Sequence, residues 1–286
     1  MSHDLVPGAE RLTLRRGLLT FDALAAGPED GPLVLFLHGF PEFATSWRAQ
    51  LLSVADAGYR AVAVDQRGYS PGARPGDVRD YVVSELLDDL FGFADELGAE
   101  RFHLVGHDWG GVLCWPAAAR RPERLISLTV LATPHPQALT EVSAASEEQR
   151  GRLAYIRLFR TEGKAEEVLL ADDAARLRAI YEGRVPAELV EDNVRRLSRP
   201  GALTAALSWY RALDSGDAEV PAITVPTLYV WGEHDLAFTA QAAEATAAWV
   251  SAPYSYLPLT GASHWLPEED PARVTGPLLE HLATHS

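Results

Sequence analysis

The chain has 286 residues, enough for one large domain or for a core that carries an insertion. It holds 25 Lys and Arg against 40 Asp and Glu, and this net charge of −15 argues against nucleic-acid and membrane-surface partners, which are themselves anionic. The single cysteine, Cys114, excludes an intramolecular disulfide and a cysteine metal cluster. Because we find no signal peptide and no apolar run of membrane-spanning length, we expect a cytoplasmic protein.

Short apolar runs alternate with longer amphipathic segments, a pattern typical of a parallel sheet with helical connections. The clearest helix is 82–98, which has apolar residues at helical spacing and a glycine at its end. A last helix is expected from 271 to the C-terminus. The expected strands, after an antiparallel hairpin at 10–25, are 33–37, 60–64, 102–105, 127–131, 227–231 and 254–257.

The strand pattern stops after Leu131 and resumes only at Thr227. The stretch between is rich in Arg, Glu and Ala and indicates several helices. Since strands return afterwards, an inserted cap is favoured over a separate second domain. We therefore predict an α/β fold with a mostly parallel sheet flanked by helices, in which residues 1–135 and 218–286 form the core and 136–217 form a helical cap.

The most informative motif is LVGHDWGG, which places Asp108 between a strand and a helix. Glycines two residues before it and two and three residues after it permit a very tight turn that exposes the central side chain. His107 occupies a position of this turn that we expect to tolerate substitution. A carboxylate that attacks an acyl carbon forms an unfavourable anhydride, whereas attack on a saturated carbon forms an ester that water can cleave. An N-capping Asp in a glycine-rich turn is the alternative.

Enzymes with this turn carry the nucleophile, the acid and the base in that order along the chain. Asp235 follows the expected strand 227–231, and His264 lies in a Gly/Ser loop after the last strand. Asp235 is the predicted acid that orients the imidazole of His264, and Glu233 is a second candidate for that role. Each residue comes just after the carboxyl end of a strand, where ligands gather in open α/β sheets.

The loop HGFPE at 38–42 also follows a strand and is predicted to complete an oxyanion hole. The backbone N–H groups of Phe40 and Trp109 are the candidate donors to an oxyanion on Asp108. The loop DQRGYS, which follows the next strand, indicates a structural role, and we expect Asp65 and Arg67 to pair with each other.

Together, HGFPE at 38–42, DQRGYS at 65–70, GHDWGG at 106–111, Asp235 and the SHW around His264 resemble the α/β-hydrolase-fold epoxide hydrolases. The resemblance extends over residues 20–280. It implies the α/β-hydrolase fold and the hydrolysis of a small apolar epoxide to a vicinal diol through an ester on Asp108. It implies no metal and no cofactor. The sequence leaves the oligomeric state open, a homodimer included.

The same family uses two cap tyrosines that bind and protonate the epoxide oxygen. The resemblance assigns these roles to Tyr155 in AYIRLFRTEG and to Tyr210 in LSWYRAL, although the residues around Tyr155 depart from the usual pattern. A phenol with a pKa near ~10 can give a proton to an alkoxide without being charged at neutral pH. Tyr155, Tyr210, Trp109 and Phe40 are therefore the predicted substrate-binding residues.

Two alternatives remain. A haloalkane or haloacid dehalogenase has the same Asp nucleophile, and the Trp109 indole would suit a halide. One group of dehalogenases, however, has Asn where this chain has Phe40, and fluoroacetate enzymes have arginine just after the nucleophile, where this chain has Trp109 and Gly110. A non-catalytic binding protein on the same fold is the alternative from another class. A serine esterase is disfavoured because the turn carries no serine.

Overall fold

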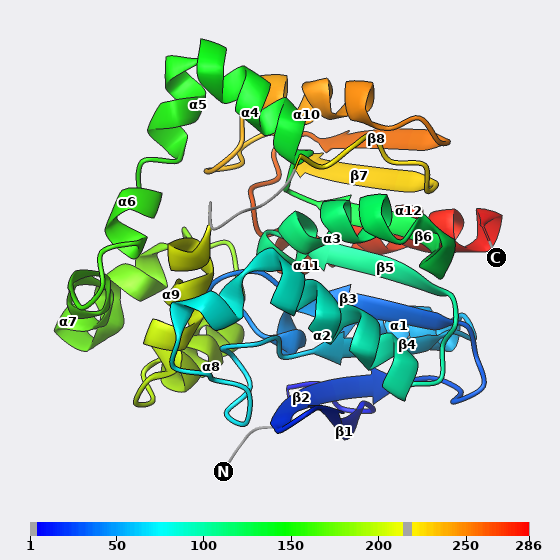
Figure 1. The fold of residues 1–286 in the computed structure, drawn as a ribbon, viewed down its shortest axis with the longest axis horizontal. Coiled ribbons are helices and arrows are strands. Elements are labelled where there is room, and N and C mark those ends of the chain that lie inside the picture. The colour runs from blue at the N-terminus through cyan, green and yellow to red at the C-terminus, as the bar shows by residue number, and fades with distance from the viewer. Residues whose placement is uncertain (1–4, 214–218, 286) are drawn as a thin grey trace.

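A computed structural model describes residues 5–213 and 219–285 as an eight-stranded sheet with helices on both faces (Figure 1). The strands are β1 Glu10–Arg16, β2 Leu19–Ala26, β3 Leu33–Leu37, β4 Arg60–Val64, β5 Phe102–His107, β6 Leu125–Leu131, β7 Thr227–Gly232 and β8 Tyr254–Leu259. The α-helices are α1 Arg48–Asp56, α2 Val83–Glu96, α3 Trp109–Arg120, α4 Pro136–Ala145, α5 Glu147–Arg152, α6 Ile156–Phe159, α7 Lys164–Ala179, α8 Ala187–Leu197, α9 Ala202–Ala212, α10 Ala240–Ala245, α11 Leu266–Glu269 and α12 Pro271–Thr284. Short 3₁₀ helices are η1 Ala44–Trp47, η2 Val78–Tyr81, η3 Pro122–Arg124 and η4 Thr246–Trp249.

The strand order β1-β2-β4-β3-β5-β6-β7-β8 confirms the mostly parallel sheet. The predicted hairpin is β1 and β2, which pair antiparallel, and β2 also pairs antiparallel with β4. From β3 onward every pairing is parallel. The chain places β4 on one side of β3 and β5 on the other, so the loops after β3 and β5 meet at a topological switch point.

Successive residues of β3 enter two different hydrophobic layers, which explains why this strand is apolar at every position. Leu35 and Leu37 pack in the layer that includes α2 and α3. Val34 and Phe36 pack in the layer that includes α1 and α12. All four side chains are at most 1% exposed, as expected for a central strand covered by helices on both faces.

Helices α4 to α9 lie between β6 and β7 in the sequence, and we call them the helical insertion. Figure 1 shows them beside one end of the sheet rather than on its faces. Within α7 the backbone leaves the helical conformation at 171–174. The predicted end of the cap at Asp217 lies outside the described residues, and the division into core and cap stays a prediction. Among the described residues, no helix is both long enough and apolar enough to cross a membrane.

The burial of β3 yields a stability prediction. Leu35→Ala should lower the free energy of unfolding by about 2–5 kcal/mol, because it opens a cavity in a layer that cannot fully collapse. Leu18→Ala is the matched control, since Leu18 is 100% exposed in the turn between β1 and β2, and it should change the value by less than about 0.5 kcal/mol. Urea unfolding followed by circular dichroism measures both, and equal losses would contradict the assigned burial.

Candidate active site

The turn between β5 and α3 holds Asp108 in a strained backbone conformation, with φ 50° and ψ −115°. Positive φ is rare for a residue other than glycine and marks functional positions more often than others. The glycines of the motif are needed for close approach. A Cβ on Gly110 would lie 2.1 Å from the Leu37 carbonyl oxygen, and one on Gly39 would lie 2.4 Å from the Asp108 Cβ. The sequence thus folds into the tight turn that its spacing predicts.

The Asp108 carboxylate is contacted by two of the predicted partners. The Phe40 N–H donates to Oδ1 at 2.7 Å. On the other oxygen, Oδ2 lies 3.5 Å from Nε2 of His264. The carboxylate also stands at the N-terminal end of α3, where the helix dipole favours negative charge. The structure therefore brings Phe40 and His264 to the predicted nucleophile, while the role of the Trp109 N–H in an oxyanion hole stays a prediction.

Asp235 rather than Glu233 contacts the imidazole. Its Oδ2 lies 2.8 Å from Nδ1 of His264, and its Oδ1 accepts the N–H groups of Ala237 and Phe238 at 2.7 and 2.8 Å. These backbone donors orient the carboxylate so that its other oxygen faces the imidazole. Asp235 is only 2% exposed. The Glu233 carboxylate instead accepts the N–H of Gly261 at 2.9 Å, in an exposed position.

The two carboxylates determine the protonation of His264. Burial alone would lower the pKa of its imidazole, but the charges of Asp235 and Asp108 and their hydrogen bonds outweigh burial and raise this pKa well above its usual range. A raised pKa in the folded state stabilises the fold below the pKa of the unfolded histidine. That contribution is lost as the pH rises through the folded-state pKa. In the unreacted site the two carboxylates therefore favour the protonated form of the imidazole.

Tyr155 directly precedes α6 and Tyr210 lies on α9, and the centres of their rings are 6.3 Å apart. Both line the same two cavities as Asp108, one of about 570 Å³ and one of about 410 Å³. Burial first, and nearby negative charge including that of Asp108, raise the pKa of both phenols above 10, so both stay neutral donors. Trp109 lines the larger cavity and packs its ring against Tyr210 at 4.8 Å. Phe40 lines the smaller one.

Both cavities have largely apolar walls. Apart from the residues they share, the larger is lined by Val83, Val112, Pro134, Leu139, Leu153 and Ile156, among others. The smaller includes Leu158, Phe159, Val168, Leu169 and Ile180. Such walls with a few convergent polar groups are typical of small-molecule sites. The arrangement suits an apolar compound whose one polar atom meets the two phenols.

His107 does not occupy the tolerant position that the sequence suggests. It is fully buried, with Nδ1 3.0 Å from Oε2 of Glu42 and Nε2 2.8 Å from the backbone oxygen of His264. Burial, and then the charge of Glu42, raise the pKa of the nearby Glu268 carboxyl, whereas the charge and hydrogen bond of His107 help to lower the pKa of Glu42 although burial opposes this. Sequence reasoning missed this group because its members lie 65 and 157 residues from His107.

The expected pair of Asp65 and Arg67 is wrong. Arg67 forms a two-bond ion pair with Asp89 of α2, at 2.6 and 2.8 Å. Asp65 accepts the Ala44 N–H at 2.8 Å and pairs with Arg196 of α8. In this loop the Arg67 side chain faces α2 and the Asp65 side chain faces the insertion, so the two do not pair.

Comparison with known proteins places this geometry in a family. Residues 32–271 match the family described as alpha/beta hydrolase fold. The chain belongs to this family. The AB hydrolase superfamily protein YfhM of Bacillus subtilis is 38% identical, over 92% of this chain and 94% of that protein. Epoxide hydrolase A of Mycobacterium tuberculosis is 33% identical, over 96% and 97%. The crystal structure of Epoxide Hydrolase A from Mycobacterium thermoresistibile superposes with a TM-score of 0.84, at 27% identity, over 97% and 99%.

The contact between Asp235 and His264 yields a prediction about charge. Asp235→Asn should lower the pKa of the His264 imidazole, because it removes the negative charge of the carboxylate beside Nδ1 and leaves the burial that disfavours the cation. Nitrogen NMR of the labelled ring, recorded as the pH is varied, measures the shift. Glu233→Gln is the control and should leave that titration unchanged, since the Glu233 carboxylate bonds to Gly261. An unchanged titration in Asp235→Asn would contradict the assigned charge coupling.

Proposed function

We propose that this protein is an epoxide hydrolase that adds water to a small apolar epoxide and forms a vicinal diol. The observation that carries the proposal is the carboxylate of Asp108, in the tight turn between β5 and α3, which lines the same two cavities as the neutral phenols of Tyr155 and Tyr210. The family match and the names of the relatives, which include epoxide hydrolases, support the same reaction. Residues 136–217 would serve as the cap that supplies the phenols.

In the first step, an oxygen of Asp108 attacks one carbon of the epoxide ring and the C–O bond to that carbon breaks. The electron pair of this bond goes to the epoxide oxygen, which takes a proton from Tyr155 or Tyr210. Both phenols are well suited because their pKa values are raised, so neither is ionised before reaction. The product of this step is an alkyl ester on Asp108.

In the second step, water attacks the carbonyl carbon of that ester. Once Asp108 is esterified, its charge no longer raises the pKa of His264, so the imidazole releases its proton to solvent more readily than in the unreacted site and its neutral form can act as the base. His264 then takes a proton from the water while Asp235 holds the ring through Nδ1. The N–H groups of Phe40 and Trp109 would bind the oxyanion. The hydrolytic step should therefore slow at low pH, where His264 stays protonated.

A dehalogenase is the second candidate, favoured by the same nucleophile and by Trp109 in the cavity wall. Its halide needs hydrogen-bond donors and no proton. At the position where such a donor would be needed, Phe40 has an apolar side chain. The centre of its ring lies 5.3 Å from that of Phe159 and 5.4 Å from that of Tyr210. Two phenols beside the carboxylate suit a leaving oxygen that must be protonated better than they suit a halide.

The covalent mechanism predicts a trapped intermediate. His264→Gln should still react with styrene oxide but should accumulate the ester, because the base for its hydrolysis is gone. Intact-protein mass spectrometry should show the added mass of one epoxide, with peptide mapping to Asp108. His285→Gln, at the far end of the chain, is the control and should accumulate none.

A labelling experiment tests the proposed reaction itself. In heavy-oxygen water, a single turnover of the unmodified protein should place label in the Asp108 carboxylate. Halide release from 1-bromobutane or chloroacetate without turnover of any epoxide would favour the dehalogenase. Absence of both the ester and the label on every epoxide and halide tried would favour a binding protein.

The proposed role of the two tyrosines as proton donors predicts the rate of ring opening in their variants. Tyr155→Phe and Tyr210→Phe should each slow ring opening of styrene oxide, and the double variant should lose about 10²–10⁴-fold, the range typical of general acid catalysis. Tyr256→Phe is the control, because Tyr256 lies on β8 and lines neither of the two cavities. Single-turnover loss of the epoxide measures the opening step alone. Rates that are unchanged in the double variant would remove the phenols from the mechanism.

A further inference from the structure

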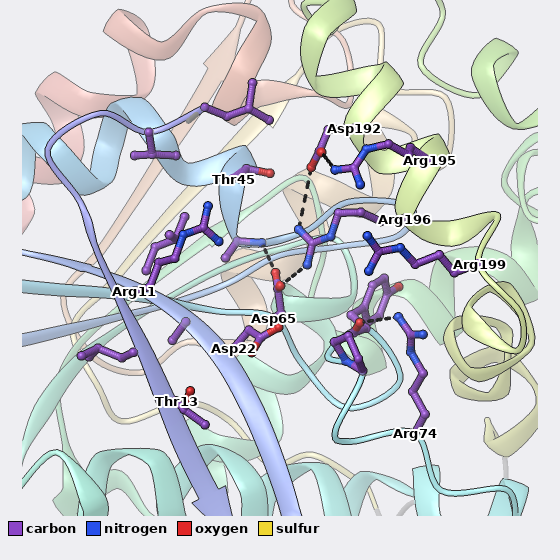
Figure 2. A pocket seen from close by; sticks show the side chains of 18 residues that line it. Arg11, Thr13, Asp22, Thr45, Asp65, Arg74, Asp192, Arg195, Arg196 and Arg199 are labelled. Carbon is purple, nitrogen blue, oxygen red and sulfur yellow. Dashed lines mark hydrogen bonds and ion pairs between the residues drawn. The ribbon is translucent and has the colours of Figure 1, made fainter. Parts of the chain in front are cut away.

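A third cavity, of about 380 Å³, lies away from Asp108 and is lined by an unusual number of arginines (Figure 2). It is formed by β1 and β2 at the edge of the sheet, by η1, by the loop after β4 and by the end of α8. Its charged residues are Arg11, Arg74, Arg195, Arg196, Arg199, Asp22, Asp65 and Asp192. Five arginines against three aspartates leave a surplus of two positive charges, in a chain whose net charge is −15.

The aspartates neutralise only part of this charge. Arg195 pairs with Asp192, and Arg196 pairs with Asp65. The side chains of Arg11 and Arg199 make no hydrogen bond or ion pair with the residues that the structure describes. Figure 2 shows these two guanidinium groups on opposite sides of the cavity, both turned toward its middle. They are free to act as donors to a ligand.

Arg74 also experiences the surplus charge. Its guanidinium already donates to the carbonyl oxygens of Gly68 and Tyr69, at 3.0 and 2.7 Å. Burial, and then repulsion from Arg196 and Arg199, lower its pKa. Cations that repel one another across a cavity are a cost to the folded state, which an anion between them would remove.

We propose that this cavity binds a small phosphomonoester. A phosphomonoester carries about −1.5 to −2 charges at neutral pH and several strong acceptor oxygens, which matches the surplus of two and the fork geometry of guanidinium groups. The volume lies within the range of roughly 300–1,000 Å³ found for small-molecule sites, which leaves room for an organic group beside the phosphate. This assignment does not depend on the proposed epoxide chemistry.

Such a ligand would connect two parts of the chain. Arg11 belongs to β1, whereas Arg199 follows α8 of the helical insertion. A phosphate held by both would bridge the insertion and the edge of the sheet. A ligand that binds only the folded state raises the free energy of unfolding with the logarithm of ligand concentration over Kd.

The test uses the full chain with inorganic phosphate, glycerol 3-phosphate and glycerol as probes, at an ionic strength fixed with potassium chloride. We expect both phosphates to bind in calorimetry and to raise the midpoint of thermal unfolding, and glycerol to do neither. Arg11→Gln combined with Arg199→Gln should weaken phosphate binding by at least about tenfold, the effect of losing charged hydrogen bonds. Arg15→Gln is the matched control, because Arg15 lies on the same strand but does not line the cavity.

Three results would overturn the proposal. The first is a thermal shift that potassium chloride alone reproduces, which would mean general screening of surface charge. The second is equal phosphate affinity in the double variant and the control. The third is sedimentation with phosphatidic acid vesicles without binding of glycerol 3-phosphate, which would assign the phosphate to a lipid. Arg199→Gln alone, checked for an unchanged circular dichroism spectrum, serves if the double variant does not fold.

Discussion

The negative charge of Asp108, buried at the end of a central strand, is the constraint on which the rest of the site depends. Its backbone is strained at φ 50°, so the turn forms only because neighbouring positions lack side chains. Its oxygens need donors, and they find one in the Phe40 N–H at 2.7 Å and one in the His264 imidazole at 3.5 Å. The strand order brings these groups together, because β3 and β5 are neighbours and their loops meet at the switch point.

The same charge gives the proposed reaction its sequence of steps. In the unreacted site the charges of Asp108 and Asp235 favour the protonated form of His264, and a protonated imidazole cannot accept a proton from water. Esterification would remove one of the two charges that favour the cation. The base would then become available only after the ester has formed. The order of the two steps then requires no conformational change, since the covalent bond itself changes the electrostatics around the imidazole.

Local patterns in the sequence predict the strands, the tight turn and the chain order of Asp108, Asp235 and His264, because each depends on spacing within a few residues. Contacts between distant segments are not predictable in this way. The structure corrects the Asp65–Arg67 pair for this reason, since Arg67 pairs 22 residues away and Asp65 pairs 131 residues away. The buried group around His107 and the arginine cavity are not predictable from the sequence for the same reason. Their charged residues come from several elements, and each one alone is typical of a solvent-exposed position.

The helical insertion is fixed to the loops that form the floor of the site, and this links the two regions. Tyr181 donates its hydroxyl to the carbonyl of Pro41 at 2.6 Å, next to Phe40. Arg196 pairs with Asp65, whose other oxygen accepts the Ala44 N–H, and its guanidinium lies 3.5 Å from the centre of the Phe43 ring. The loop that carries Phe40, the proposed oxyanion donor, is thus held in place by the insertion. Since Arg196 also lines the arginine cavity, an anion there would act on the contact that keeps this loop in place.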